Sequence, residues 1–109
     1  MEYENEEEVD VVSDIYDAIY FTAEEYGFDV TDENINLDDG YVSFYIERNS
    51  EEDPLFVKIK YERSNTWACV FNVKIGYYQK DFMVNADNPF AYCVQKVFEY
   101  IKEKGLDYF

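Results

Sequence analysis

The chain has 109 residues, of which 48% are hydrophobic and 20% aromatic, and its 25 Asp and Glu residues outnumber 9 Lys and Arg residues to give a net charge of −16. This length is typical of one domain with a single core, and the aromatic content is too high for a disordered acidic tail. The sequence contains no histidine, which excludes Ser-His and Cys-His catalytic systems and His-based zinc sites. Its four glycines are isolated from one another, which excludes a glycine-rich phosphate loop. We therefore expect a folded protein that is not an enzyme and that holds no metal and no cofactor.

The first 29 residues hold eleven carboxylates and not one Lys or Arg. Apolar residues recur in this segment in steps of three and four, which is the mark of an amphipathic helix. They are Val12, Ile15, Ile19, Ala23 and Tyr26. We expect the helix to begin near Asn5, where Asn5 and Glu8 have the spacing of a capping box, and to end at Gly27. Its acids have no basic residue four positions away to relieve their repulsion.

The two halves of the chain differ in charge. Residues 1–53 contain 19 acids and one base, Arg48, whereas residues 54–109 contain 6 acids and 8 bases. A protein made acidic only for solubility would spread its carboxylates over the whole surface, so this asymmetry indicates charge directed at a partner. The plainer alternative is an acidic helix face that is simply solvated.

Alternation of apolar and polar residues with a period of two follows the helix. It predicts four strands, over 34–37, 41–47, 55–63 and 66–77. Asp38, Asp39 and Gly40 supply a hairpin connection between the first two strands, with glycine placed for a positive φ. Residues 78–86 are either a loop or a short fifth strand.

A second helix is predicted by start and stop signals at its two ends. Asn88 is its N-cap, Pro89 takes its first position, and Gly105 follows its last turn. The order of elements predicts a single α+β domain (α-β-β-β-β-α) that spans the chain, with a four-stranded antiparallel sheet and both helices on one face.

The alternation in the last predicted strand places the side chain of Trp67 on the inward side of the sheet. The expected core residues are Val12, Ile19, Phe44, Val57, Ile59, Phe71, Val73, Val94, Phe98 and Ile101.

The opposite face of the sheet is expected to carry aromatic and lysine side chains. They are Tyr41, Tyr45, Phe56, Lys58, Lys60, Val70 and Lys74. Aromatic residues between cations are typical of surfaces that stack single-stranded nucleic acid. The net charge of −16 opposes direct nucleic-acid binding, so a covered face or a contact in a homodimer is the favoured interpretation.

The two cysteines, Cys69 and Cys93, sit within apolar runs, and nothing like a signal peptide precedes them. We expect both to be free thiols in a cytoplasmic protein. No apolar run approaches the ~20 residues of a membrane span, so we expect no membrane partner.

Carboxylates on the first helix, in the 38–39 turn and in the 51–53 loop are the candidate partner-binding residues. They are Glu6, Glu7, Glu8, Asp10, Asp14, Asp17, Glu24, Glu25, Asp38, Asp39, Glu51, Glu52 and Asp53. A small, strongly acidic α+β domain of this kind resembles the DNA-mimicking inhibitors of phages and mobile elements, such as anti-CRISPR and anti-restriction proteins. The resemblance implies a stoichiometric block of the basic nucleic-acid-binding groove of a partner, such as a CRISPR effector nuclease. Tyr3, Tyr16, Tyr20 and Phe21 lie beside these acids in the sequence and would anchor the contact.

Two other interpretations remain open. The chain also resembles the acidic immunity proteins that block basic nuclease toxins, and it is similar in size and charge to the acidic adaptors or chaperone-like homodimers of secretion systems. An adaptor would carry its exposed apolar area in grooves or a dimer face away from the first helix. A charge mimic would carry aromatic residues among its acids.

Overall fold

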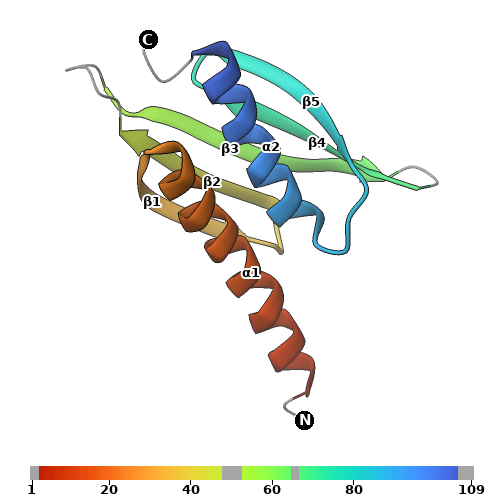
Figure 1. Ribbon diagram of the computed structural model, residues 1–109. Helices are drawn as coiled ribbons and strands as arrows, with labels where there is room; N and C mark the ends of the chain where they lie inside the picture. The colour runs from red at the N-terminus through yellow and green to blue at the C-terminus, as the bar shows by residue number, and fades with distance from the viewer. Residues whose placement is uncertain (1–2, 48–52, 65–66, 106–109) are drawn as a thin grey trace.

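The computed structural model of the protein describes residues 3–47, 53–64 and 67–105, and within these ranges the side chains from Val11 onward. A long helix comes first, strands follow, and a second helix ends the described chain (Figure 1). The elements are α1 (Tyr3–Tyr26), β1 (Asp29–Asn36), β2 (Tyr41–Glu47), β3 (Leu55–Ser64), β4 (Cys69–Ile75), β5 (Tyr78–Val84) and α2 (Pro89–Lys104). The predicted α+β domain is confirmed, but its sheet has five strands where the sequence predicted four.

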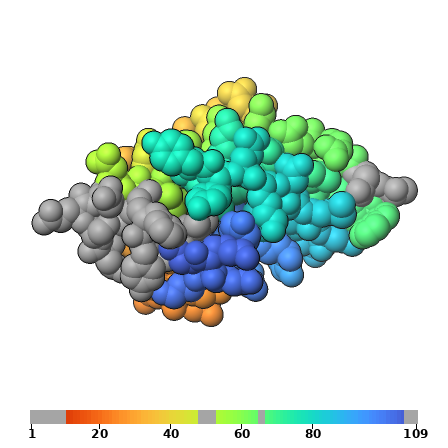
Figure 2. All heavy atoms as spheres, turned by 90° about the horizontal axis from the view of Figure 1, so that it is seen from above, coloured from red at the N-terminus to blue at the C-terminus, as the bar shows by residue number. Residues whose placement is uncertain are grey.

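The strands form one antiparallel sheet in the order of the chain, β1-β2-β3-β4-β5. Both helices lie on the same face of this sheet and pack against each other (Figure 1). Figure 2, which looks at the molecule from above, shows the end of α1 in orange and α2 in blue on one side of the strands. The predicted placement of the helices is confirmed, and no described element covers the other face of the sheet.

α2 is closed at both ends by the residues that the sequence indicated. Asn88 Oδ1 accepts a hydrogen bond from the backbone N–H of Ala91 at 3.3 Å, and Pro89 opens the helix. Gly105 ends it with a φ of 65°, a left-handed conformation that glycine adopts without strain. Asn88 Nδ2 also donates to the backbone carbonyl of Val11 at 3.3 Å, so the cap of α2 contacts α1 as well.

The described part of α1 begins at Tyr3, two residues before the predicted start near Asn5, and helix ends commonly differ by one or two residues. Its end was predicted correctly. Gly27 has a φ of 76°, and the N–H of Phe28 bonds the carbonyl of Ala23 at 2.7 Å, which closes the last turn.

β1 is longer than the predicted 34–37 strand because it begins at Asp29. Its pairing with β2 is interrupted between Thr31 and Asn34, where Asp32 has a φ of 54°. An extra residue in a bulge moves the following side chains to the other face, so the period of two breaks there. The alternation in the sequence therefore revealed only the part of the strand after the bulge.

β5 is the strand that the predicted order lacked. It pairs with β4 at the edge of the sheet, and Lys80 occupies one of its helix-facing positions, opposite the buried Val73. The Lys80 ammonium lies 4.6 Å from the ring centre of Tyr100 and 5.5 Å from that of Phe82. A lysine at a helix-facing position hides the alternation of the strand, because a charged residue in the sequence predicts a solvent-facing side chain.

The core lies between the sheet and the two helices, and nine of the ten predicted core residues are buried. The exception is Val12, which is half-buried. Phe98 of α2 stacks on Phe44 with ring centres 5.4 Å apart. The inward placement of Trp67 is wrong: its side chain is 67% exposed, because β4 begins only at Cys69.

Both cysteines are free thiols, as predicted. Cys69 is half-buried on β4, and Cys93 is buried on α2. Burial disfavours the charged thiolate and raises the pKa of Cys93 to about 12.

Candidate functional site

The exposed face of α1 is the centre of the candidate site. Asp14, Asp17 and Glu24 are exposed, and steps of three or seven residues place them along one side of the helix, with Glu25 exposed beside them. The other side of the helix is buried, with Ile19 fully enclosed in the core. Packing thus fixes the helix through one face and leaves the carboxylates on the other.

An aromatic ring stands among these acids. Phe21 lies between Asp17 and Glu24 on the same side of α1, and its side chain is 68% exposed. Full burial of a phenylalanine side chain contributes about 1.5–3 kcal/mol of stabilising free energy. Most of this contribution is absent at Phe21 in the isolated protein. We call Asp14, Asp17, Phe21 and Glu24 the acidic stripe.

Two tyrosines border the acidic stripe on the side of β1. Tyr16 and Tyr20 stack one helical turn apart, with ring centres 6.5 Å from each other, and Tyr20 is 48% exposed. The Tyr20 hydroxyl donates a hydrogen bond to the carboxylate of Glu33, and this bond raises the pKa of Tyr20 above its ordinary value. The contact ties α1 to β1 and brings a further carboxylate to the edge of the stripe.

Glu33 is a residue of the site that the sequence did not reveal. It lies in the interruption of the β1–β2 pairing, directly after Asp32, and the bulge rather than a strand alternation sets its direction. Asp29 and Asp32 of β1 are exposed as well. A run of acids ahead of the predicted strand was the available signal, but it does not show which carboxylate meets α1.

The acids of the two predicted loops lie at opposite ends of β2. Asp38 and Asp39 are exposed in the turn before this strand, where Asn36 holds Asp39 by two hydrogen bonds of 3.0 Å, one to its carboxylate and one from its backbone N–H. Asp53 is exposed beyond the other end, ahead of β3. Since a seven-residue strand such as β2 spans about 20 Å, these acids do not form one cluster.

Other predicted binding residues are only partly placed. Four of them lie on the backbone of α1 with side chains outside the described part of the structure, and Tyr3 shares this position. They are Glu6, Glu7, Glu8 and Asp10. Glu51 and Glu52 lie outside the described residues altogether. The site as described therefore consists of the acidic stripe, Glu25, the tyrosine pair and Glu33.

The described carboxylates of α1 have no basic side chain as a partner. The helix carries no basic residue, including in its last turn, where a cation would favour the helix dipole. Among the side chains that the structure describes, no ion pair joins an acid of α1 to a Lys or Arg. The carboxylates of Asp14, Asp17, Glu24 and Glu25 are thus available to an external cation.

No protein-family model matches the sequence, and comparison with curated proteins and with solved structures gives no significant match. In the part of the chain that the structure describes, no helix has both the length and the apolar character that crossing a membrane requires. Within the same residues, no three Asp, Glu or Cys side chains are grouped so as to hold a metal ion. The case for a function rests on the surface of α1.

Proposed function

We propose that the protein is an acidic inhibitor that mimics nucleic-acid charge and stoichiometrically blocks the basic nucleic-acid-binding groove of a partner, such as a CRISPR effector nuclease. The binding surface in this proposal is the acidic stripe, extended by Glu25, Glu33 and the acids of the first turns of α1. The inhibitor acts by occupying the groove, in the cytoplasm, and it does not bind nucleic acid itself.

The observation that carries the proposal is Phe21, exposed in the middle of an uncompensated row of carboxylates. Charge alone steers association and is screened over about 8 Å at physiological salt. Lasting complexes depend on a few anchors, and aromatic side chains often supply them. A surface that combines carboxylates with an exposed aromatic side chain is suited to a specific basic groove. Solvation of a helix face alone does not require an exposed phenylalanine.

The charge spacing of α1 also supports the proposal. The helix has 24 residues, so it is about 36 Å long at 1.5 Å per residue. Its nine carboxylates therefore follow one another at an average of about 4 Å along the axis. A single DNA strand carries one charge per ~3.4 Å of axis, so a row of Lys and Arg side chains that fits phosphates also meets these acids.

A capture experiment tests the proposal. The full chain is immobilised, and proteins of a bacterial lysate are bound at about 50 mM NaCl and eluted at about 500 mM, where the screening length falls to a few ångströms. We expect a basic nucleic-acid-binding protein in the eluate, and we expect duplex DNA to compete with the immobilised protein for it. Direct binding of DNA to the isolated chain, or capture that saturating DNA leaves unchanged, would contradict charge mimicry.

Exposed apolar side chains far from α1 favour a second candidate, an acidic adaptor that holds a client protein on apolar surface. Tyr77 is fully exposed in the β4–β5 turn, followed by the half-exposed Tyr78, and Met83 is exposed on β5. Replacing Tyr77 and Met83 by Ser separates the two candidates. Capture that survives high salt and is lost in this variant would support the adaptor, whereas salt-sensitive capture that the variant retains supports the mimic.

A further inference from the structure

A basic cluster lies on the face of the sheet that no described helix covers. The strand register pairs Lys58 of β3 directly with Lys74 of β4, and Lys60 follows two residues later on the same face. Like charges directly opposite each other on neighbouring strands are destabilising. Three of the nine basic residues of a protein with a net charge of −16 thus gather on one face of the sheet.

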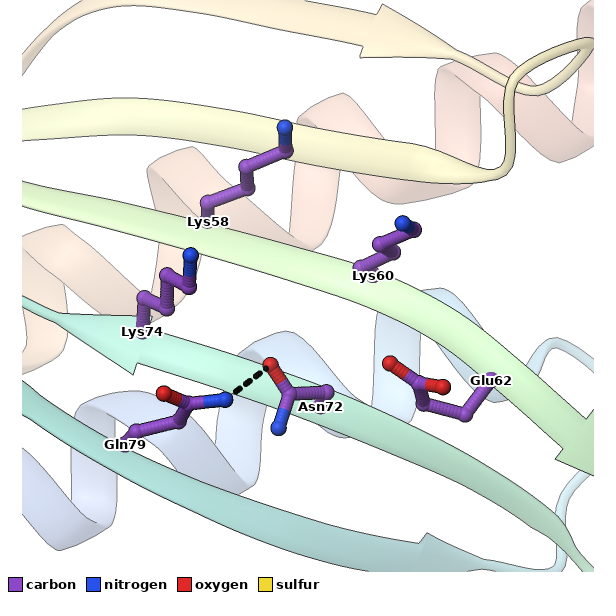
Figure 3. Close-up of a pocket in the computed structure, with 6 residues that line it drawn as sticks. All are labelled: Lys58, Lys60, Glu62, Asn72, Lys74 and Gln79. Atoms are coloured by element: carbon purple, nitrogen blue, oxygen red, sulfur yellow. Dashed lines mark hydrogen bonds between the residues drawn. The ribbon is translucent and has the colours of Figure 1, made fainter.

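The basic cluster borders a depression of about 260 Å³. Figure 3 shows the depression with both helices behind the sheet and the side chains of all three lysines extending over the strands. Its lining residues are Lys58, Lys60, Glu62, Asn72, Lys74 and Gln79. With three lysines against one glutamate, the depression is locally positive on a strongly negative protein.

The polar neighbours of the depression are held in fixed orientations. Gln79 Nε2 donates to Asn72 Oδ1 at 3.0 Å (Figure 3), and Asn72 Nδ2 donates to Asp81 Oδ1 at 2.9 Å. The carboxylate of Asp81 is therefore engaged by an amide and not by a lysine. Lys58 Nζ lies 4.6 Å above the ring centre of Tyr41, which positions this ammonium at the edge of the depression.

Lys60 and Lys74 are exposed, and neither forms an ion pair with a carboxylate that the structure describes. Each ammonium offers three donors, and a lysine binds phosphate as a point charge. Three cations around one shallow hollow suit a multiply charged oxyanion, because such a ligand relieves all of their mutual repulsions together. A single carboxylate would neutralise only part of the cluster.

We propose that the basic cluster binds the phosphate or diphosphate group of a small molecule. The organic part of the ligand is expected to lie toward Tyr45 and Phe56, which form a cross-strand ring pair with centres 5.0 Å apart on the same face as Lys58. The acids of α1 lie on the opposite side of the sheet, and salt screens charges over about 8 Å, so they do not cancel the local field of the lysines. This site is independent of the proposed capture of a basic partner, which uses other residues and the other sign of charge.

Titration of the full chain with inorganic pyrophosphate and with a nucleoside diphosphate, followed by amide NMR and calorimetry, tests the proposal. We expect saturable binding of both ligands, with shifts centred on Lys58, Lys60, Asn72, Lys74 and Gln79. The nucleoside diphosphate should also shift Tyr45 and Phe56. Both lysines of a Lys60→Gln, Lys74→Gln variant are exposed, so it should fold normally and bind about tenfold more weakly or worse, as expected for the loss of charge-assisted contacts.

The matched control is Lys102→Gln, Lys104→Gln, which removes the same charge from two exposed lysines of α2. Its affinity for pyrophosphate should stay within about twofold of the unaltered chain, since affinity here follows local contacts. Equal weakening in both variants would show a general charge effect and overturn the site. So would the absence of saturation by pyrophosphate, or binding of a single-stranded oligonucleotide without binding of either small ligand.

Discussion

The two helices pack on the same face of the sheet, yet their exposed sides differ in the balance of acidic and basic residues. α2 is capped by Asn88 and Gly105, and its three lysines accompany two glutamates. α1 carries nine acids and no base over its 24 residues. The buried sides of both helices are ordinary core, so the difference lies only in what they present to the surroundings.

The contrast shows that the residues that stabilise the fold and the residues that carry the charge of α1 are different residues. The contacts that hold the fold together lie on the buried sides of both helices and on the inner face of the sheet, where the rings of Phe98 and Phe44 stack. The exposed side of α1 contributes repulsion and an unburied phenylalanine, neither of which stabilises the isolated protein. Substitutions on the two sides are therefore expected to have separable consequences.

The largest expected effect is the loss of a buried ring. Phe98→Ala should lower the free energy of unfolding by about 3–5 kcal/mol, because it removes contacts to Phe44 and Phe28 and leaves a cavity. The same truncation on α1, Phe21→Ala, should change it by no more than about 0.5 kcal/mol. Urea unfolding of both variants measures the difference, and a comparable loss from Phe21→Ala would show that the acidic stripe is part of the core.

A smaller effect is expected where the helices are linked. Asn88→Ala removes both the cap of α2 and the bond to the carbonyl of Val11, and should cost about 1–2 kcal/mol. Asn88→Asp keeps the capping oxygen and loses only the donor to Val11, so it should cost less than half as much. Thermal unfolding distinguishes the variants, and equal losses would mean that the link to α1 matters more than the cap.

High pH should weaken the fold through α2. The pKa of Cys93 is about 12 in the folded state and ordinarily near 9, so the thiol contributes stability that is complete below about pH 9 and is lost as the pH rises through about 12. At about pH 10 the expected loss is on the order of 1 kcal/mol. The chain should show this loss in urea unfolding, and Cys93→Ala should show less of it. A Cys69→Ser variant that abolished the loss instead would contradict the assignment.

The smallest expected effect is a gain. Asp14→Asn combined with Asp17→Asn removes two like charges from one side of α1, so the protein should become more stable by a few tenths of a kcal/mol at low salt. The gain should shrink as salt is added, because screening already weakens the repulsion. A loss of stability in thermal unfolding would mean that these carboxylates make contacts on which the fold depends.

Much of the fold could be predicted because local chemistry and tertiary structure agree there. Asn88, Pro89 and Gly105 mark α2, and alternation marks β2 and β3. β5 was missed because Lys80 occupies a helix-facing position, and the first half of β1 was missed because of the bulge at Asp32. Both failures arise where the period of two is broken or disguised.

The candidate sites divide in a similar way. Helical periodicity alone predicts that Asp14, Asp17 and Glu24 share one exposed side, because all three lie on the same helix. The meeting of Glu33 with Tyr20 and the pairing of Lys58 with Lys74 depend on strand register, which no single segment encodes. Val70 lies on the lysine face as predicted, and its side chain is only 4% exposed between Arg63 of β3 and Met83 of β5.

The most direct test of the central claim compares the two helices for binding a partner. The affinity of the captured protein is measured for Asp14→Asn, Asp17→Asn on α1 and for Glu99→Gln, Glu103→Gln on α2, which remove equal charge from exposed positions. If α1 is the nucleic-acid mimic, the first variant should bind at least about tenfold more weakly, while the second stays within about twofold. Equal affinities of the two variants would show that net charge, and not the surface of α1, governs the interaction, and would contradict the account.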